Sequence, residues 1–296
     1  MIIRNHINVK DNQLLDGLRP VVGIMSQVEA SGENEVTVDF ADTKFISPVF
    51  ALSLIVYLTR CGKKVLFVNA SDYLNLIGIS SGGIKPDQMR QTEFLAALER
   101  YATRTYIPII DFAAGPDTDV KDAVSSIVEN LIIRQLNLQK NVANGLKYMI
   151  AETLDNITEH SESDRGYIFA QAYPKKGFLD VCIADRGITL LGSYQKLKNN
   201  EIANDSEAIK AANRGISSKN LPEAENRGFG IKTSKQMLIN GLGGQYLMIS
   251  GGSLYVKSPH LDSFYAMPPG LRWNGTIVAL RIPYKAPTFN YIDYLE

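Results

Sequence analysis

Residues 151–160 read AETLDNITEH and follow directly on the apolar run LKYMI. At 3.6 residues per turn, one stripe of this predicted helix is apolar. Glu152, Asn156 and His160 are spaced by four residues and form a column along the edge of that stripe. A column in this position lines a cleft beside the core. Taken alone, however, the pattern is more typical of boundary residues on an amphipathic surface helix.

Two further segments favour a ligand-binding cleft. CIADRGIT ends an apolar strand with Asp185, and Gly187 follows two residues later. A carboxylate at a strand end can accept a hydrogen bond from an exocyclic amine, and a glycine lets a planar ring approach the backbone. ENRGFGIKTSK places Gly228 and Gly230 just before a helix. Backbone N–H groups at such a site can hold phosphate, assisted by the helix dipole.

In this order, the segments resemble the motifs of the GHKL superfamily, which includes gyrase, the MutL proteins, heat-shock chaperone ATPases and histidine kinases. AETLDNITEHS is similar to its N-box, DRGIT to its G1 box, NRGFGI to its G2 box, and GT at 275–276 to its last motif. The resemblance covers roughly residues 106 to 284. It implies an ATP-binding α/β sandwich of the Bergerat type, with helices on one face of a mixed, mostly antiparallel sheet.

The resemblance also implies a role for each matching residue. Asn156 would be the protein ligand of Mg²⁺, and Glu152 would be the catalytic residue that orients or deprotonates the attacking water or hydroxyl. Asp185 would accept a hydrogen bond from the adenine amino group, and Gly187 would support the ring. The remaining implied ATP-binding positions, at the phosphates, in a water network behind Asp185 and near the lid, are Gly228, Phe229, Gly230, Thr276, His160, Arg227 and Lys232.

The motifs depart from the family pattern at two positions. Thr189 replaces the last glycine of the G1 box, and Asn226 replaces the first glycine of the G2 box. Asn tolerates left-handed backbone angles, so we expect altered lid hinges rather than lost binding. Lys232 and Thr233 also resemble the end of a P-loop, but the glycine spacing of that motif is absent. Lys232 is therefore expected to be solvated.

Two features of the cleft stay open on sequence alone. His160 fits a phosphate contact and a helix-end hydrogen bond equally well. The stretch 189–226 is long for a connection and carries Lys210, Arg214 and Lys219. A basic lid that closes over triphosphate and a surface helix with solvated charges both fit it.

The order of elements in the second half predicts a sheet covered by helices. Gly177 supplies a tight turn between two of the strands, and Gly241 closes the last helix. Strands are expected at 106–112, 166–173, 178–185, 245–250, 253–257 and 276–283, and helices at 119–136, 141–160 and 229–240.

The first half reads as a strand–helix–strand unit, which favours parallel strands. VTVDF (36–40) and KKVLFVN (63–69) are the predicted strands, both buried, and SPVFALSLIVYLTR (47–60) is the helix between them, ended by Gly62. A short helix at DYLNLIGI follows. These pieces resemble, more weakly, a STAS domain, the antagonist partner of anti-sigma-factor kinases. Ser47 is expected to be a helix N-cap rather than a phosphosite.

Length and composition set the organisation. A chain of 296 residues favours two domains. We predict a STAS-like domain at 1–85, a linker at 86–105, an ATP-binding domain at 106–286 and a tail at 287–296. The halves are expected to separate on limited proteolysis.

The composition also bounds location and partners. Lys plus Arg equals Asp plus Glu at 31 each, so no whole-chain charge attracts nucleic acid or membrane. Cys61 and Cys182 lie far apart, which favours a reducing compartment, and the first residues lack a signal peptide. The sequence therefore predicts a cytoplasmic protein that binds ATP or ADP and contacts a protein partner through its STAS-like domain. A homodimer is also compatible.

Three functions fit this interpretation. The first is an ATP-dependent switch that Glu152 resets by hydrolysis. The second is a serine/threonine kinase of the anti-sigma-factor type, acting on a STAS-like partner. The third is a non-catalytic nucleotide sensor. Histidine autophosphorylation is disfavoured, because none of the three histidines lies on a paired-helix dimerisation domain.

Overall fold

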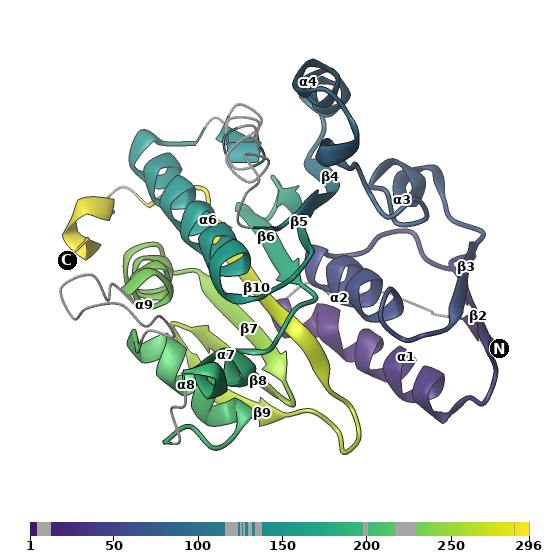
Figure 1. The fold of residues 1–296 in the computed structure, drawn as a ribbon. Helices are drawn as coiled ribbons and strands as arrows, with labels where there is room; N and C mark the ends of the chain where they lie inside the picture. The colour runs from purple at the N-terminus through teal and green to yellow at the C-terminus, as the bar shows by residue number, and fades with distance from the viewer. Residues whose placement is uncertain are drawn as a thin grey trace.

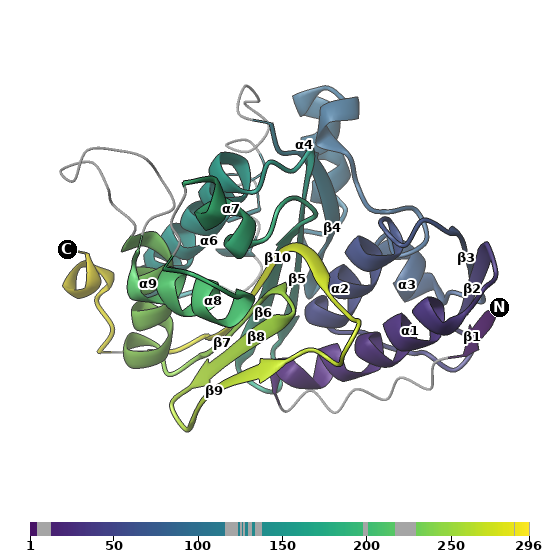
Figure 2. The ribbon, with the colours of Figure 1, turned by 60° about the horizontal axis from the view of Figure 1, so that its bottom comes forward.

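The protein has two β-sheets with helices between them and on the outer face of the larger one (Figures 1 and 2). The computed structural model describes residues 1–4, 13–115, 124, 126, 128–129, 132–133, 138–197, 201–216, 229–286 and 288–295. The small sheet has the order β1-β2-β3, and the large sheet has the order β4-β5-β6-β10-β7-β8-β9. The described structure is thus mixed α/β, as the sequence predicts.

The small sheet is parallel throughout, as the strand–helix–strand pattern predicts. Its strands are β1 (Ile2–Arg4), β2 (Glu35–Asp39) and β3 (Lys64–Val68). Strand β3 was predicted to be buried, and that prediction is wrong: its residues are exposed or half-buried, and it is an edge strand of the small sheet.

The helix α2 (Pro48–Leu58) lies between the two sheets, and all eleven of its residues are buried. It contacts β5, β6 and β10 of the large sheet and packs beside α1 (Leu18–Ala30). Ser47 is its N-cap and accepts a hydrogen bond from the Phe50 N–H at 3.3 Å, which confirms the predicted cap. The helix ends at Leu58, four residues before Gly62. A helix that is apolar on every side needs to be packed between two sheets, because none of its faces is suited to contact with water.

The large sheet differs from the expected sandwich in two ways. Every pairing of its named strands is antiparallel rather than mixed. Helices cover both faces rather than one: α2 covers one face, whereas the helices of the second half cover the other (Figure 2). Its strands are β4 (Tyr106–Ala113), β5 (Arg165–Tyr173), β6 (Phe178–Asp185), β7 (Gln245–Gly251), β8 (Ser253–Ser258), β9 (Leu261–Ala266) and β10 (Trp273–Pro283).

The outer helices of the second half agree with most of the expected elements. They are α6 (Lys140–His160), α7 (Leu190–Lys196), α8 (Asp205–Arg214) and α9 (Phe229–Gln236), the last continuing as a π-helical turn, Met237–Gly241. Gly177 has φ +76° in the turn between β5 and β6, as predicted. The helix expected at 119–136 lies mostly outside the described residues, although those described there are helical.

The segment predicted as a linker, 86–105, contains a 3₁₀ turn, Pro86–Gln88, and the helix α4 (Gln91–Glu99). Phe94 and Leu98 of α4 are buried in the core beneath α6. A short helix, α3 (Asp72–Leu76), precedes this segment as predicted. The boundary itself stays a prediction, but the packing of α2 and α4 favours one cooperative unit over two separable domains.

The packing of α2 can be tested with Leu52→Ala. Leu52 is fully buried within the core that both sheets share. We expect the truncation to lower the free energy of unfolding by about 2–5 kcal/mol. Urea unfolding, followed by far-UV circular dichroism and tryptophan fluorescence, should show one shared transition that moves to lower urea. Leu76→Ala, at a side chain that is 44% exposed, serves as the control and should change little. Two separate transitions would contradict the shared core.

Candidate functional site

Asp185, the last residue of β6, is the centre of the candidate site. Only 1% of its surface is exposed, and each carboxylate oxygen accepts one backbone hydrogen bond. Gly187 N–H donates to Oδ1 at 2.8 Å, and Thr276 N–H donates to Oδ2 at 3.1 Å. Burial raises the pKa of Asp185 to about 7, although both N–H donors lower it. The structure thus brings Thr276 to Asp185 and Gly187, from which it is about 90 residues away in sequence.

The backbone around the Asp185 carboxylate is packed so closely that two of its positions have no room for a side chain. A Cβ on Gly187 would lie 1.9 Å from the carbonyl oxygen of Ser161, which directly follows α6. A Cβ on Gly275 would lie 2.4 Å from the Asp185 carbonyl oxygen, and Gly275 has φ +98°. The G1-like loop therefore packs directly on the end of α6, and the GT motif packs directly on Asp185.

Ser250 completes the support behind Asp185, and sequence analysis did not identify it. Its hydroxyl lies 3.2 Å from Thr276 Oγ1 and 3.2 Å from the Gly275 carbonyl oxygen, and it accepts the Leu190 N–H at 3.0 Å. Ser250 is 1% exposed at the end of the apolar stretch QYLMIS. A hydroxyl inside an apolar strand was the signal that could have found it. It joins β7, β10 and the start of α7.

The side of α6 that carries Glu152 lies against α9. Gly230 sits so close to Glu152 that an added Cβ would lie 1.9 Å from Oε2. Tyr148, one turn earlier, interacts with both Glu152 and Thr233, and burial together with the Glu152 charge raises its pKa to about 12. Asn156 donates its amide N–H to the Glu152 carbonyl at 2.6 Å. The N-box-like helix and the helix after the G2-like segment therefore form one wall.

The placement of the other predicted residues is only partly visible. Arg227 and Gly228 lie outside the described residues. Phe229 begins α9 and His160 ends α6, but their side chains are not described. Lys232 lies in the first turns of α9 and is half-buried rather than fully solvated.

The described part of the stretch 189–226 contains the two helices α7 and α8. Thr189, the departure from the G1 pattern, is the N-cap of α7 and accepts the Gly192 N–H at 3.2 Å. Helix α8 contacts β7 and β8. Lys235 of α9 donates a hydrogen bond to the carbonyl of Asn213 in α8 at 2.9 Å. Burial lowers the pKa of Lys235 to about 8. Helix α8 is thus held on the body.

The three cations of the proposed lid have different surroundings. Lys210 lies on α8 with its Nζ 5.2 Å from the centre of the Phe264 ring. Arg214 is exposed in the last turn of α8, and Lys219 lies outside the described residues. Lys210 therefore has a local partner in the described structure, and the closure of a basic lid stays a prediction.

The donor set can be compared with what Mg²⁺ requires. The Asn156 amide nitrogen is engaged by a backbone carbonyl, so its oxygen is the atom left for a hard cation. Within the described part of the chain, no three His, Cys, Asp or Glu side chains cluster as a metal site. A magnesium ion that is bound chiefly by phosphate oxygens and water needs only one ligand from the protein, and the Asn156 oxygen could serve as that ligand.

Comparisons with known proteins gave no relative: no family model, no curated protein and no solved structure matches this chain. A search of the described helices for a membrane-spanning segment found none of sufficient length and apolarity. The site is therefore interpreted from its own residues.

The contact between Gly187 and Ser161 predicts the effect of Gly187→Ala. The new methyl group would overlap a backbone carbonyl, which cannot rotate away as a side chain can. We expect a loss of about 1–3 kcal/mol in the free energy of unfolding, measured by urea denaturation. Gly23→Ala is the matched control, because nothing lies within 4 Å of its added Cβ in α1. That variant should be neutral or slightly stabilised. Equal effects of both substitutions would show that the G1-like loop tolerates displacement.

Proposed function

We propose that this protein binds Mg-ATP between α6, the Asp185 strand end and α9, and acts as an ATP-dependent switch. The observation that carries the proposal is the buried carboxylate of Asp185, held by two backbone N–H groups beside two close-packed glycines. A carboxylate fixed in this way is a preorganised acceptor for an exocyclic amine. The order of the GHKL-like motifs along the chain supports adenine as the ring that carries this amine.

The reacting end of the nucleotide belongs, in this proposal, at Glu152 and Asn156. Asn156 would bind Mg²⁺ through its amide oxygen, and the ion would neutralise phosphate charge. Glu152 lies one turn away and would orient or deprotonate the attacking water. Because Glu152 also touches Gly230, a movement of α9 would move the carboxylate. Nucleotide state and the position of α9 are thereby linked, which is what a switch requires.

Phosphoryl transfer to the protein's own Ser47 is disfavoured by the position of that residue. Ser47 is 4% exposed and its hydroxyl caps α2, so it offers no accessible acceptor in this conformation. Transfer to a hydroxyl of a separate protein and pure nucleotide sensing stay as alternatives. Labelled ATP separates the three functions, because hydrolysis releases phosphate, transfer labels a protein, and sensing does neither.

The division of labour in the site predicts different defects for two variants. Asp185→Asn replaces a charged acceptor with an amide, and ATP affinity should fall by about 10- to 100-fold. Glu152→Ala should keep ATP affinity and abolish turnover, because its carboxylate acts mainly in the transition state. Calorimetry with Mg-ATP measures the first, and phosphate release measures the second.

The control for both variants is Glu99→Ala, an exposed carboxylate on α4. It should match the wild type in binding and turnover. If the wild type shows neither calorimetric binding nor a rise in melting temperature with millimolar Mg-ATP, the proposed function is wrong.

The raised pKa of Asp185 predicts how stability changes with pH. The pKa rises from 3.8, the ordinary value, to about 7 in the folded protein. As the pH rises, Asp185 therefore loses its proton at a lower pH in the unfolded chain than in the folded protein. The stability contributed by protonated Asp185 is complete below about pH 4 and is lost as the pH rises through 7. Asp185→Asn cannot ionise and lacks this loss.

Urea unfolding of both proteins between pH 4 and pH 8 tests this linkage. The free energy of unfolding of the wild type minus that of Asp185→Asn should fall with pH, by at most about 1.4 kcal/mol per pH unit. A difference that is constant or rises with pH would contradict the raised pKa of Asp185.

A further inference from the structure

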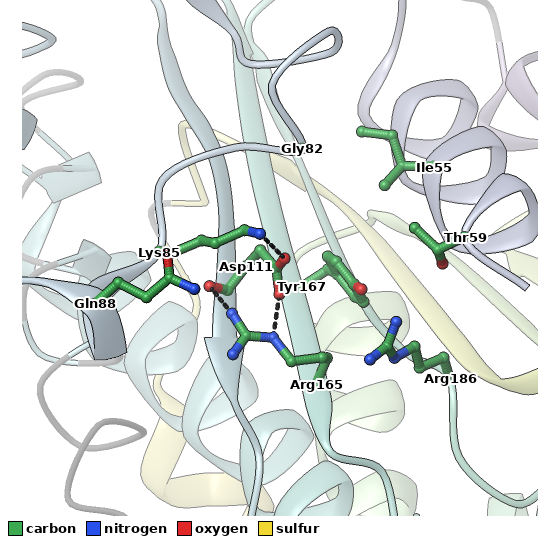
Figure 3. Close-up of a pocket in the computed structure, with 9 residues that line it drawn as sticks. All are labelled: Ile55, Thr59, Gly82, Lys85, Gln88, Asp111, Arg165, Tyr167 and Arg186. Atoms are coloured by element: carbon green, nitrogen blue, oxygen red, sulfur yellow. Dashed lines mark hydrogen bonds and ion pairs between the residues drawn. The ribbon is translucent and has the colours of Figure 1, made fainter. Parts of the chain in front are cut away.

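A pocket lies on the face of the large sheet opposite the proposed nucleotide site, where the two halves of the chain meet (Figure 3). Its volume is about 330 Å³. One wall comes from the end of α2 and the loop after α3, through Thr59, Gly82 and Lys85. The other wall comes from β5 and the residue that follows β6, through Arg165, Tyr167 and Arg186.

The alternation of side chains along β6 separates the two sites. Val181 and Ile183 pack in the core beneath α6, whereas Cys182 and Ala184 pack in the core that contains α2. Asp185 continues the first series. Its neighbour Arg186 lines the pocket on the α2 side. One strand end therefore supplies the proposed nucleotide site on one face and this pocket on the other.

The guanidinium of Arg165 is already neutralised. Its Nε donates to Asp111 Oδ1 at 2.6 Å, and Nη1 donates to Asp87 Oδ2 at 2.8 Å. Nη2 donates to Asp87 Oδ1 at 3.1 Å and to the Asp111 carbonyl at 2.7 Å. Arg165 thus holds the two acids together, and of these two it is Asp111 that lines the pocket.

Lys85 and Arg186 differ from Arg165, because each keeps donors for a ligand. Lys85 Nζ lies 3.9 Å from Asp111 Oδ2, beyond hydrogen-bonding distance, and the side chain is 39% exposed. Arg186 binds the largely exposed Asp164 through Nε and Nη2. Within the described part of the chain, its Nη1 donates no hydrogen bond. The two side chains enter the pocket from opposite sides (Figure 3).

We propose that this pocket binds a small molecule that carries an oxyanion, a phosphate or a carboxylate, held between Lys85 and Arg186. Such a group accepts charge-assisted hydrogen bonds from both cations. Gly82 faces open space, with nothing within 4 Å of an added Cβ, so a ligand can approach its backbone. The Gln88 amide adds a neutral polar group, and Ile55 and Tyr167 line the remaining wall for an uncharged portion.

The test is calorimetry on the full chain without nucleotide, using inorganic phosphate, pyrophosphate and citrate as separate probes. At least one probe should bind with a dissociation constant in the millimolar range or below. Lys85→Met and Arg186→Gln should each weaken that binding tenfold or more. Lys175→Met removes an exposed lysine in the turn between β5 and β6 and should leave binding unchanged. Binding of citrate alone would assign a carboxylate ligand, and binding of phosphate or pyrophosphate alone a phosphate ligand.

Two outcomes would overturn the inference: no heat from any probe with the wild type, or binding that Lys85→Met leaves intact. Lys85 is partly exposed and makes one long ion pair in the part of the chain that the structure describes, so Lys85→Met should fold even if Arg186→Gln does not. Melting temperature checks the folding of each variant. Since no nucleotide is present, this result is independent of ATP binding, and either proposal can fail alone.

Discussion

Helix α2 has no face for water, and the rest of the structure accommodates that constraint. A run of eleven buried residues can be covered only if apolar layers lie on both sides of the helix. The small parallel sheet provides one layer and the large antiparallel sheet provides the other. The large sheet must then be apolar on both of its faces, because α6 and its neighbours cover the far side. Its central strands are accordingly continuous runs of buried residues rather than alternating ones.

A sheet covered on both faces leaves polar groups few places to lie, and they gather at the strand ends. Asp185 and Arg186 are adjacent in sequence, yet one faces α6 and the other the α2 side. The Arg165 cluster also lies at the ends of β4 and β5. Between β6 and β10 the sheet also holds the buried ion pair of Asp180 and Arg281, with Nε to Oδ1 at 2.7 Å. Burying either charge alone would cost free energy, whereas the paired charges form hydrogen bonds with each other.

Local sequence patterns predicted the elements of the second half well, because they are strongly periodic. The α6 pattern and the Gly177 turn needed no tertiary information. Helix α1 was missed, although its apolar residues recur at helical spacing, because Pro20 and Gly23 interrupt LRPVVGIMSQVEA. Strand β9 was missed for another reason: its residues are mostly exposed, so it has no core-facing pattern. Helix α4 was not predicted within the proposed linker, because among its residues Phe94 and Leu98 alone are buried and the apolar pattern is weak.

The contacts of the candidate site are likewise of two kinds, some between residues close in sequence and some between distant residues. Asp185 and Gly187 lie two residues apart, so their hydrogen bond follows from a local turn that the DRG motif encodes. The second N–H on Asp185 comes from Thr276, 91 residues away, and no local pattern encodes that distance. Arg165, which lines the pocket, is joined to Asp87 across 78 residues, and no local pattern encodes that pairing either. Sequence motifs could therefore indicate the chemistry of one face of the strand end. The opposite face depends on α2 being placed against the sheet, which only the complete fold shows.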